Sequence, residues 1–211
     1  MEKENSLKEN FKQDFFYLGV MAIITSFLGW FIENLAKFCG GGNIDSRFHI
    51  LPFISVYGLI VFAVYLLIGN PNDITMFGKH LFKEKSKKKT IFSNITTILL
   101  IYFAVFFGEL IAGNLWNILF GVKLWNYSHH LTHVTQFTSL RSTFSFGTLA
   151  FVLVKYIYYP SLNYLKVHMS YKTAKLITCI VYPLIIVDSL VMYLSIIFFH
   201  KAPVYWHLKL K

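Results

Sequence analysis

The chain alternates long apolar runs with short polar connections, and five of the runs are long enough to predict membrane-spanning helices. A helix needs about 20 apolar residues to cross the hydrocarbon of a bilayer. The runs cover about residues 15–35, 51–69, 91–120, 143–159 and 174–199. We therefore expect an all-α, polytopic membrane protein with about five transmembrane helices. Residues 15–211 would form a single membrane domain behind a polar tail, residues 1–14.

Two of these runs depart from a simple upright helix. The third run is too long to stand upright in a bilayer, so it must tilt, kink near Gly108 or Gly113, or extend beyond the membrane. The fourth run is expected to end at Pro160, and the fifth contains Pro183 and Asp188. We expect Asp188 to serve polar packing near the proline, with proton or ion coupling as the alternative.

The basic residues predict the orientation. Most of the 20 Lys and Arg residues fall in the N-terminal tail, in residues 70–90 and in residues 161–175. Because positive residues collect on the cytoplasmic side, we expect the N-terminus inside and the C-terminus outside. The Lys83–Lys89 cluster would anchor the chain at anionic headgroups or, alternatively, dock a partner.

Composition places the chain in the cell membrane as a multi-pass protein. Hydrophobic residues make up 55% of it, and the mean hydropathy is +0.53. No cleavage signal follows the first run, which we interpret as a retained span. The net charge of +10 lies mostly in the predicted cytoplasmic connections, so it indicates membrane lipids as partners and not nucleic acid. Cys39 and Cys179 are expected at opposite faces and unbridged.

Carboxylates within the apolar runs are the candidate functional groups. Glu33 lies near the end of the first run and Glu109 two-thirds of the way along the third. An acidic residue at the centre of a spanning helix costs about 2.5–3.5 kcal/mol on insertion scales. The chain has only two arginines to pair with them, Arg47 and Arg141.

With the N-terminus inside, nearly all of these polar residues fall toward the outer side. Asn117 shares a helical face with Glu109 and Gly113 by its three- and four-residue spacing. The connection between the third and fourth runs adds further polar and aromatic residues, namely Trp125, Asn126, Tyr127, Ser128 and Arg141. Two interpretations stay open: arginine–carboxylate pairs that fix helix packing, or an outward-facing polar cavity that binds or moves something.

The remaining sequence motifs give little indication of function. His129, His130 and His133 are weak candidates for a metal site, and we expect none. The chain has no Gly-x-x-x-x-Gly-Lys-[Ser/Thr] phosphate loop and no Gly-x-Ser-x-Gly elbow. We expect no cofactor, and enzymatic activity is left open.

Several motifs occur in an order that resembles a known family. They are Gly29-Trp30-Phe31-Ile32-Glu33, then Arg47 with Leu51-Pro52 and Val56-Tyr57-Gly58, then Trp125-Asn126-Tyr127-Ser128. This order resembles the CmpB-type family of bacterial membrane proteins, described as an ABC-transporter type IV permease. The resemblance implies that Glu33, Arg47, Tyr57, Trp125, Tyr127 and Ser128 are site residues.

The chain departs from the family pattern in places. Asn126 stands where the family has Asp, and Phe48 stands where it has Gly after the arginine. The resemblance implies a permease-like component of a transport system, with a separate ATP-binding subunit or another membrane subunit as candidate partner. The alternatives are an intramembrane lipid-modifying enzyme or lipid-binding accessory protein acting at the outer leaflet, or an accessory subunit with no site of its own.

Overall fold

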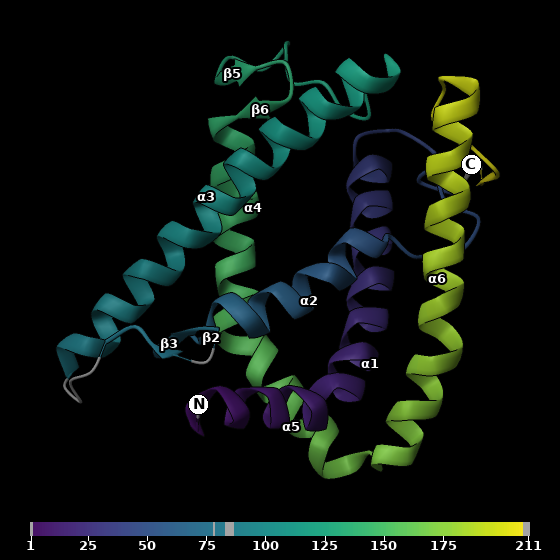
Figure 1. Ribbon diagram of the computed structural model, residues 1–211. Helices are drawn as coiled ribbons and strands as arrows, with labels where there is room; N and C mark the ends of the chain where they lie inside the picture. The colour runs from purple at the N-terminus through teal and green to yellow at the C-terminus, as the bar shows by residue number, and fades with distance from the viewer. Residues whose placement is uncertain (1, 78, 83–86, 209–211) are drawn as a thin grey trace. The chain divides into compact units, whose positions relative to one another are not determined.

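The computed structural model describes residues 2–77, 79–82 and 87–208, with the side chains of residues 2–10 and 87 left out (Figure 1). Lys83 and Lys85 of the predicted lysine cluster lie outside the described residues. The chain is mostly helical, as expected, and divides into two compact units. One comprises Met1–Ala63 and Ser161–Lys211, and the other comprises Val64–Pro160.

The first unit is built on two long helices. Helix α1 (Glu2–Cys39) packs along α6 (Tyr171–Phe199), and the two run side by side in Figure 1. Leu18 and Ala22 of α1 and Ile185 of α6 are almost fully buried. The Thr178 hydroxyl of α6 donates to the Phe16 carbonyl of α1 at 2.9 Å. Polar side chains that bond across spanning helices in this way help to hold them together.

Shorter elements complete the first unit. Strand β1 (Ile44–Asp45) pairs antiparallel with β7 (His207–Leu208), so the C-terminal segment lies along the α1–α2 connection. Helix α2 (Ser55–Leu67) continues into the second unit, and α5 (Tyr159–His168) enters the first unit from it. Ser170 caps α6 by accepting a bond from the Thr173 N–H at 3.1 Å.

The second unit contains α3 (Lys87–Phe120), which packs against α4 (Leu140–Leu153). Helix α4 continues as a π-helical segment (Val154–Tyr158) into α5. Helix α3 ends at Gly121, whose φ of +67° is the left-handed conformation that suits a glycine after a helix. The hairpin of β5 (His133–Thr135) and β6 (Thr138–Ser139) lies in the connection between α3 and α4.

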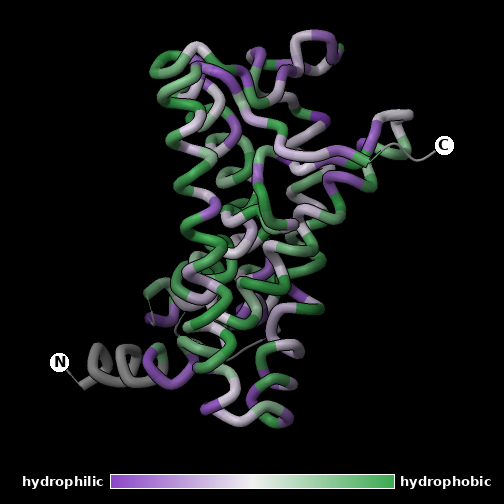
Figure 2. Tube along the Cα trace, turned by 90° about the vertical axis from the view of Figure 1, so that its right-hand side faces the viewer, coloured by the Kyte–Doolittle hydropathy of each residue, from purple (hydrophilic) through white to green (hydrophobic). Residues whose placement is uncertain are grey.

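Within the described part of the chain, three helices are long and apolar enough to cross a membrane: Phe11–Cys39, Lys88–Phe120 and Tyr171–Phe199. Hydrophobic residues run along most of the length of these helices in Figure 2. They match the first, third and fifth predicted runs. Helix α3 has 34 residues and continues without interruption through Gly108 and Gly113. It is therefore longer than an upright membrane span requires, as predicted.

The second and fourth runs differ from their expected bounds. Helix α2 has only 13 residues because residues 51–54, which include Pro52, are not helical. The fourth run does not end at Pro160, since helical structure continues to His168. Proline lacks an N–H and its ring crowds the carbonyl four residues earlier. The wider π-helical turn immediately before Pro160 gives that ring room, so the helix survives.

A small sheet occupies a connection in which no strand was expected. Strands β2 (Gly69–Asn70), β3 (Asp73–Met76) and β4 (Lys79–His80) form two successive antiparallel pairs. Ile74 is fully buried, and its N–H donates to the Ser93 hydroxyl of α3 at 2.7 Å. This bond and the ion pair of Asp73 with Lys89 at 2.7 Å attach the sheet to the beginning of α3.

Candidate functional site

Glu33, Arg47 and Tyr57 form the polar centre of the first unit. Glu33 Oε2 accepts hydrogen bonds from both Nε (2.8 Å) and Nη2 of Arg47, and Oε1 accepts one from the Tyr57 hydroxyl at 2.9 Å. The Arg47 and Glu33 side chains are 26% and 28% exposed, so the pair is only partly solvated. One carboxylate thus joins α1, the α1–α2 connection and α2. The forked arginine supplies donors in a geometry that lysine cannot reproduce.

Gly29 makes room for this arrangement. It lies one helical turn before Glu33, and a Cβ placed on it would come within 2.2 Å of the Tyr57 ring. Only a residue without a side chain lets the ring approach α1 this closely, and the hydroxyl then reaches the carboxylate one turn further along. The Gly29-Trp30-Phe31-Ile32-Glu33 motif is therefore a packing surface followed by a hydrogen-bond acceptor.

The backbone around Arg47 adopts an uncommon conformation. Arg47 and Phe48 have φ angles of 49° and 72°, in the left-handed region that side chains disfavour. Non-glycine residues keep such angles only where their surroundings hold them. The φ angle of Phe48 is one that glycine adopts without strain. The Arg47 guanidinium lies 5.8 Å from the Phe48 ring centre, a cation–π contact that a glycine would not offer.

Asp45 fixes the beginning of the same loop. Its N–H donates to Asn34 Oδ1 at 2.8 Å, and its carboxylate accepts from Lys37 Nζ and, at 2.9 Å, from the Arg47 N–H. Partial burial acts to raise the pKa of Asp45, but the Lys37 bond and the Arg47 N–H outweigh it and hold the pKa below its ordinary value. Asp45 therefore stays ionised and orients Arg47 through the backbone.

Asp188 holds the other end of the loop. Its two carboxylate oxygens accept from the N–H groups of Ile50 (2.8 Å) and Leu51 (3.1 Å). Polar packing is thus its role here, though the groups it bonds belong to the α1–α2 connection and not to the backbone near Pro183. Non-helical backbone close to spanning helices needs such internal partners, because lipid offers none.

His49 lies in the same connection, outside the candidate spans, with Nδ1 3.5 Å from Asp188 Oδ2. Both side chains are 4% exposed. Burial lowers the pKa of His49 below its ordinary value, and the charges of Asp188 and Glu33 oppose that shift without reversing it. His49 is therefore neutral at neutral pH.

The C-terminal segment covers this loop. Trp206 donates its indole N–H to the Ile50 carbonyl at 2.9 Å, and its ring lies 5.8 Å from that of Trp30. The Ser46 hydroxyl accepts from the Tyr205 N–H at 3.2 Å. Sequence reasoning missed Tyr205 and Trp206. Their only signal was a pair of aromatic residues in a short C-terminal tail, which is also typical of a membrane interface.

Glu109 is the centre of a different cluster, in the second unit. Its Oε1 atom accepts from the Ser142 hydroxyl at 2.7 Å and from the Tyr127 hydroxyl at 3.2 Å. The Thr138 hydroxyl lies 3.4 Å from Oε2. These partners come from α4 and from the connection that precedes it. No basic side chain among the described residues pairs with Glu109, so an arginine–glutamate pair at this position is not present.

Aromatic packing positions this second cluster. A Cβ on Gly113 would lie 2.4 Å from Phe137, so this glycine admits the fully buried Phe137 ring against α3. The Trp125 indole N–H donates to the Phe137 carbonyl at 2.8 Å. Phe137 and Trp125 together hold the connection beside α3, which brings Tyr127 and Thr138 to Glu109. The small-residue face predicted around Gly113 is used, although its partner is a hairpin residue.

The remaining predicted residues, Asn126, Asn117 and Arg141, are exposed or half-buried and make only local hydrogen bonds or no ion pair among the described residues. Asn126 is exposed, and its Oδ1 accepts from the backbone N–H (2.9 Å) and the hydroxyl (2.6 Å) of Ser128, which forms a local turn. Asn117 is half-buried and accepts the Gly121 N–H through its backbone carbonyl at 3.0 Å. Arg141 is exposed and makes no ion pair in the described part of the chain. The predicted residues therefore form two clusters, one in each unit.

The three histidines of the α3–α4 connection do not form a metal centre in the structure. The His129 and His130 rings contact each other at 4.6 Å, and His133 Nδ1 lies 2.7 Å from the His130 carbonyl. Among the described residues no group of three or more His, Cys, Asp or Glu side chains could hold a metal ion. Cys39 and Cys179 are both free and exposed.

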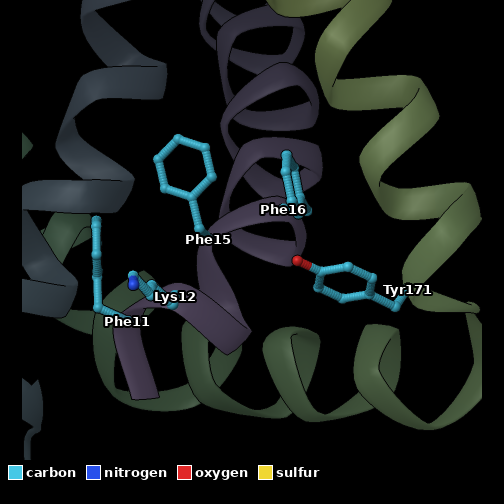
Figure 3. Close-up of a pocket in the computed structure, with 5 residues that line it drawn as sticks. All are labelled: Phe11, Lys12, Phe15, Phe16 and Tyr171. Carbon is cyan, nitrogen blue, oxygen red and sulfur yellow. The ribbon is translucent and has the colours of Figure 1, made fainter. Parts of the chain in front are cut away.

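An apolar hollow of about 290 Å³ lies at the opposite end of α1 from Glu33 (Figure 3). It is lined by Phe11, Lys12, Phe15 and Phe16 of α1 and by Tyr171 of α6. The Lys175 amine lies over the Phe16 ring at 5.8 Å. Rings beside amines are typical of a membrane interface. The hollow contains no carboxylate and none of the predicted site residues.

Long apolar helices with polar networks between them define a multi-pass membrane protein. The comparison with protein families makes this more specific, because the model of the family described as "Putative ABC-transporter type IV" matches residues 20–193. The chain belongs to this family, which confirms the resemblance carried by its motifs. No match was found among the curated proteins or among the solved structures.

Proposed function

We propose that the chain is a permease-like membrane subunit of a transport system whose energy comes from a separate ATP-binding subunit. The family match over residues 20–193 carries this proposal. Two further features support it: the helices hold ionisable groups that a purely structural span would avoid, and the sequence has no phosphate-binding loop of its own. Nucleotide hydrolysis would therefore take place on a partner.

The proposal includes an orientation, with the N-terminus in the cytoplasm, and an outward-facing polar cavity. Glu33, Arg47 and Tyr57 would contribute from one unit, and Glu109, Tyr127 and Arg141 from the other. It also includes five crossings. Helix α2 covers about 20 Å at 1.5 Å per residue, so the extended residues before it would have to complete its crossing. Residues 140–168 are helical throughout and long enough for another.

A lipid-modifying or lipid-binding role at the outer leaflet is the second candidate. The observation that favours it is local: Ser142 donates a hydrogen bond to Glu109 at 2.7 Å, and the neighbouring Arg141 is exposed. A carboxylate beside a hydroxyl can exchange protons with it, and an exposed arginine suits a phosphate headgroup. Arg47 is less suited to that role because Glu33 already occupies its guanidinium.

The test is purification of the tagged protein in a mild detergent, followed by native mass spectrometry and an ATP hydrolysis assay. We expect a stoichiometric nucleotide-binding subunit and ATP hydrolysis by the purified complex. An unrelated multi-pass protein with the same tag is the control. A chain that purifies alone, carries a defined phospholipid and has no ATPase activity would overturn the transport proposal in favour of the lipid role.

A further inference from the structure

Glu109 differs from the other acidic side chains in its lack of a basic partner. Each of the other acidic side chains that the structure describes lies beside one, although the imidazole beside Asp188 is neutral at neutral pH and two backbone N–H groups hold that carboxylate instead. The pairs are Asp14 with Lys166, Glu33 with Arg47, Asp45 with Lys37, Asp73 with Lys89, and Asp188 with His49. Glu109 contacts only hydroxyl groups, although it lies within the candidate span Lys88–Phe120. Its charge therefore has no counter-charge in the described part of the protein.

The contacts of Glu109 form a closed triangle of oxygen atoms. Ser142 Oγ lies 2.7 Å from Glu109 Oε1 and 3.1 Å from the Tyr127 hydroxyl, which in turn lies 3.2 Å from Glu109 Oε1. All three sides of the triangle are hydrogen-bonding distances. The Ser142 and Tyr127 hydroxyls carry one hydrogen each, and an ionised glutamate carries none. Two hydrogens are then available for three oxygen–oxygen contacts, so one of the three contacts has no hydrogen.

A proton on Glu109 supplies the missing hydrogen. A neutral carboxyl group is a donor as well as an acceptor. The three groups can then bond in a ring, with each donating to the next and accepting from the one before. Protonation also removes the uncompensated charge, which is costly within a span. Hydrogen counting and charge compensation are separate arguments, and both favour the protonated form.

Among the described residues, no basic side chain pairs with Glu109 in place of this proton. Arg141, next to Ser142 on α4, is exposed and makes no ion pair among the described residues. In the preceding connection, the titratable ring of His130 lies 5.2 Å from the Tyr127 ring. Thr138 adds only a hydroxyl, 3.4 Å from Oε2.

We propose that Glu109 is a proton-binding site in which Ser142 and Tyr127 complete a hydrogen-bonded ring around the protonated carboxyl group. The titrating proton is on Glu109 of α3, and it is held by Ser142 of α4 and by Tyr127 of the connection before α4. The site gives the protein a group that responds to pH or to proton movement. The proposal does not depend on the transport function, and its test does not require a known substrate.

The test is infrared difference spectroscopy of the purified protein in lipid nanodiscs. The wild type should have a protonated-carboxyl C=O band at neutral pH that shifts on exchange into D₂O. Glu109→Gln should remove the band while keeping the fold, because the amide also supplies hydrogens to the ring. Ser142→Ala should shift its frequency, and Ser145→Ala, an exposed serine on the same helix, should leave it in place.

Two results would overturn the proposal. One is the absence at neutral pH of any carboxyl band that depends on Glu109. The other is loss of the band when sodium replaces choline at constant pH, which would identify a metal-ion site instead. If Glu109→Gln does not fold, the comparison of Ser142→Ala with Ser145→Ala still assigns the band. The search for a co-purifying ATP-binding subunit tests the transport proposal separately, so it can fail while the proton-binding site is confirmed, and the reverse also holds.

Discussion

The Arg47 guanidinium forms its ion pair with Glu33, and the contribution of this pair to stability can be measured. Glu33 accepts two bonds from the guanidinium and a third from Tyr57. Removing one member of a partly buried pair leaves the other without its partner, and that penalty commonly exceeds the net value of the pair. The sequence pointed to both residues through their cost in an apolar run, but it left open which arginine would pair with which glutamate.

Glu33→Gln should lower the free energy of unfolding by about 1.5–3 kcal/mol, the range for hydrogen bonds to charged groups. The amide keeps an acceptor for Tyr57 but cannot neutralise Arg47. Thermal or denaturant unfolding in detergent would measure the change. The double variant Glu33→Gln/Arg47→Gln should cost less than the sum of the two single variants. Additive costs would contradict a coupled pair.

His49 makes a prediction about pH. Burial lowers its pKa from an ordinary value of 6.5, so the unfolded chain takes up a proton below pH 6.5 while the folded chain does not. The unfolded state then binds more protons, and stability falls as the pH drops from 6.5 toward the lowered pKa. Asp45 and Asp73 would contribute only at lower pH, because their pKa values lie below 3.8.

The melting temperature of the wild type in detergent should therefore decrease as the pH falls below 6.5. His49→Gln, which carries no charge at any of these pH values, should have a flatter profile over that window. A control variant, His207→Gln, changes an exposed histidine and should retain the wild-type slope. Equal slopes in the wild type and in His49→Gln would show that another group titrates.

At the scale of elements, the sequence predicted the long spans well and the short connections poorly. Apolar runs identify α1, α3 and α6 because length and hydropathy are enough for a spanning helix. They misplace the beginning of α2, since the bonds from Ile50 and Leu51 to Asp188 hold that backbone out of a helix. They also end the fourth helical segment at Pro160, whereas it continues to His168, because a π-helical turn is not visible in a hydropathy pattern.

Glycines in these helices have different roles, and two of them make a matched pair. A Cβ on Gly29 would lie 2.2 Å from the Tyr57 ring, whereas a Cβ on Gly108 of α3 would have nothing within 4 Å. Gly29→Ala should therefore destabilise the protein and move the Tyr57 hydroxyl away from Glu33. Gly108→Ala should stabilise it by about 0.5–1 kcal/mol, the usual cost of a glycine within a helix.

Unfolding of both variants in the same detergent tests this contrast. Tyr57→Phe serves as the control for the lost hydroxyl bond. Gly29→Ala should cost more than Tyr57→Phe, because the ring itself must move. Similar effects for Gly29→Ala and Gly108→Ala would mean that helix propensity alone decides both, and the close approach of Tyr57 to α1 would then be wrong.

For the whole molecule, the sequence placed the candidate site residues in one cavity on the basis of orientation alone. The structure assigns them to two clusters, with Glu33, Arg47 and Tyr57 in one unit and Glu109 and Tyr127 in the other. Hydropathy and charge bias predict the depth of a residue along the membrane normal. They do not predict which helices are neighbours, so the shared cavity stays a prediction, as does the single membrane domain.

The orientation itself can be tested with the two native cysteines. Cys39 lies at the end of α1 and is exposed, while Cys179 lies within the candidate span of α6. If the N-terminus is cytoplasmic, Cys39 faces the outside.

A membrane-impermeant maleimide should then label the Cys179→Ser variant, which keeps Cys39, in intact spheroplasts. It should not label the Cys39→Ser variant. A cysteine placed in the tail by Ser6→Cys, with both native thiols replaced by serine, should react only after lysis. The reverse pattern would place the N-terminus outside. The lysine-rich connections would then face outward, where they could not meet an ATP-binding subunit, so this labelling result also decides whether the proposed energy source is geometrically possible.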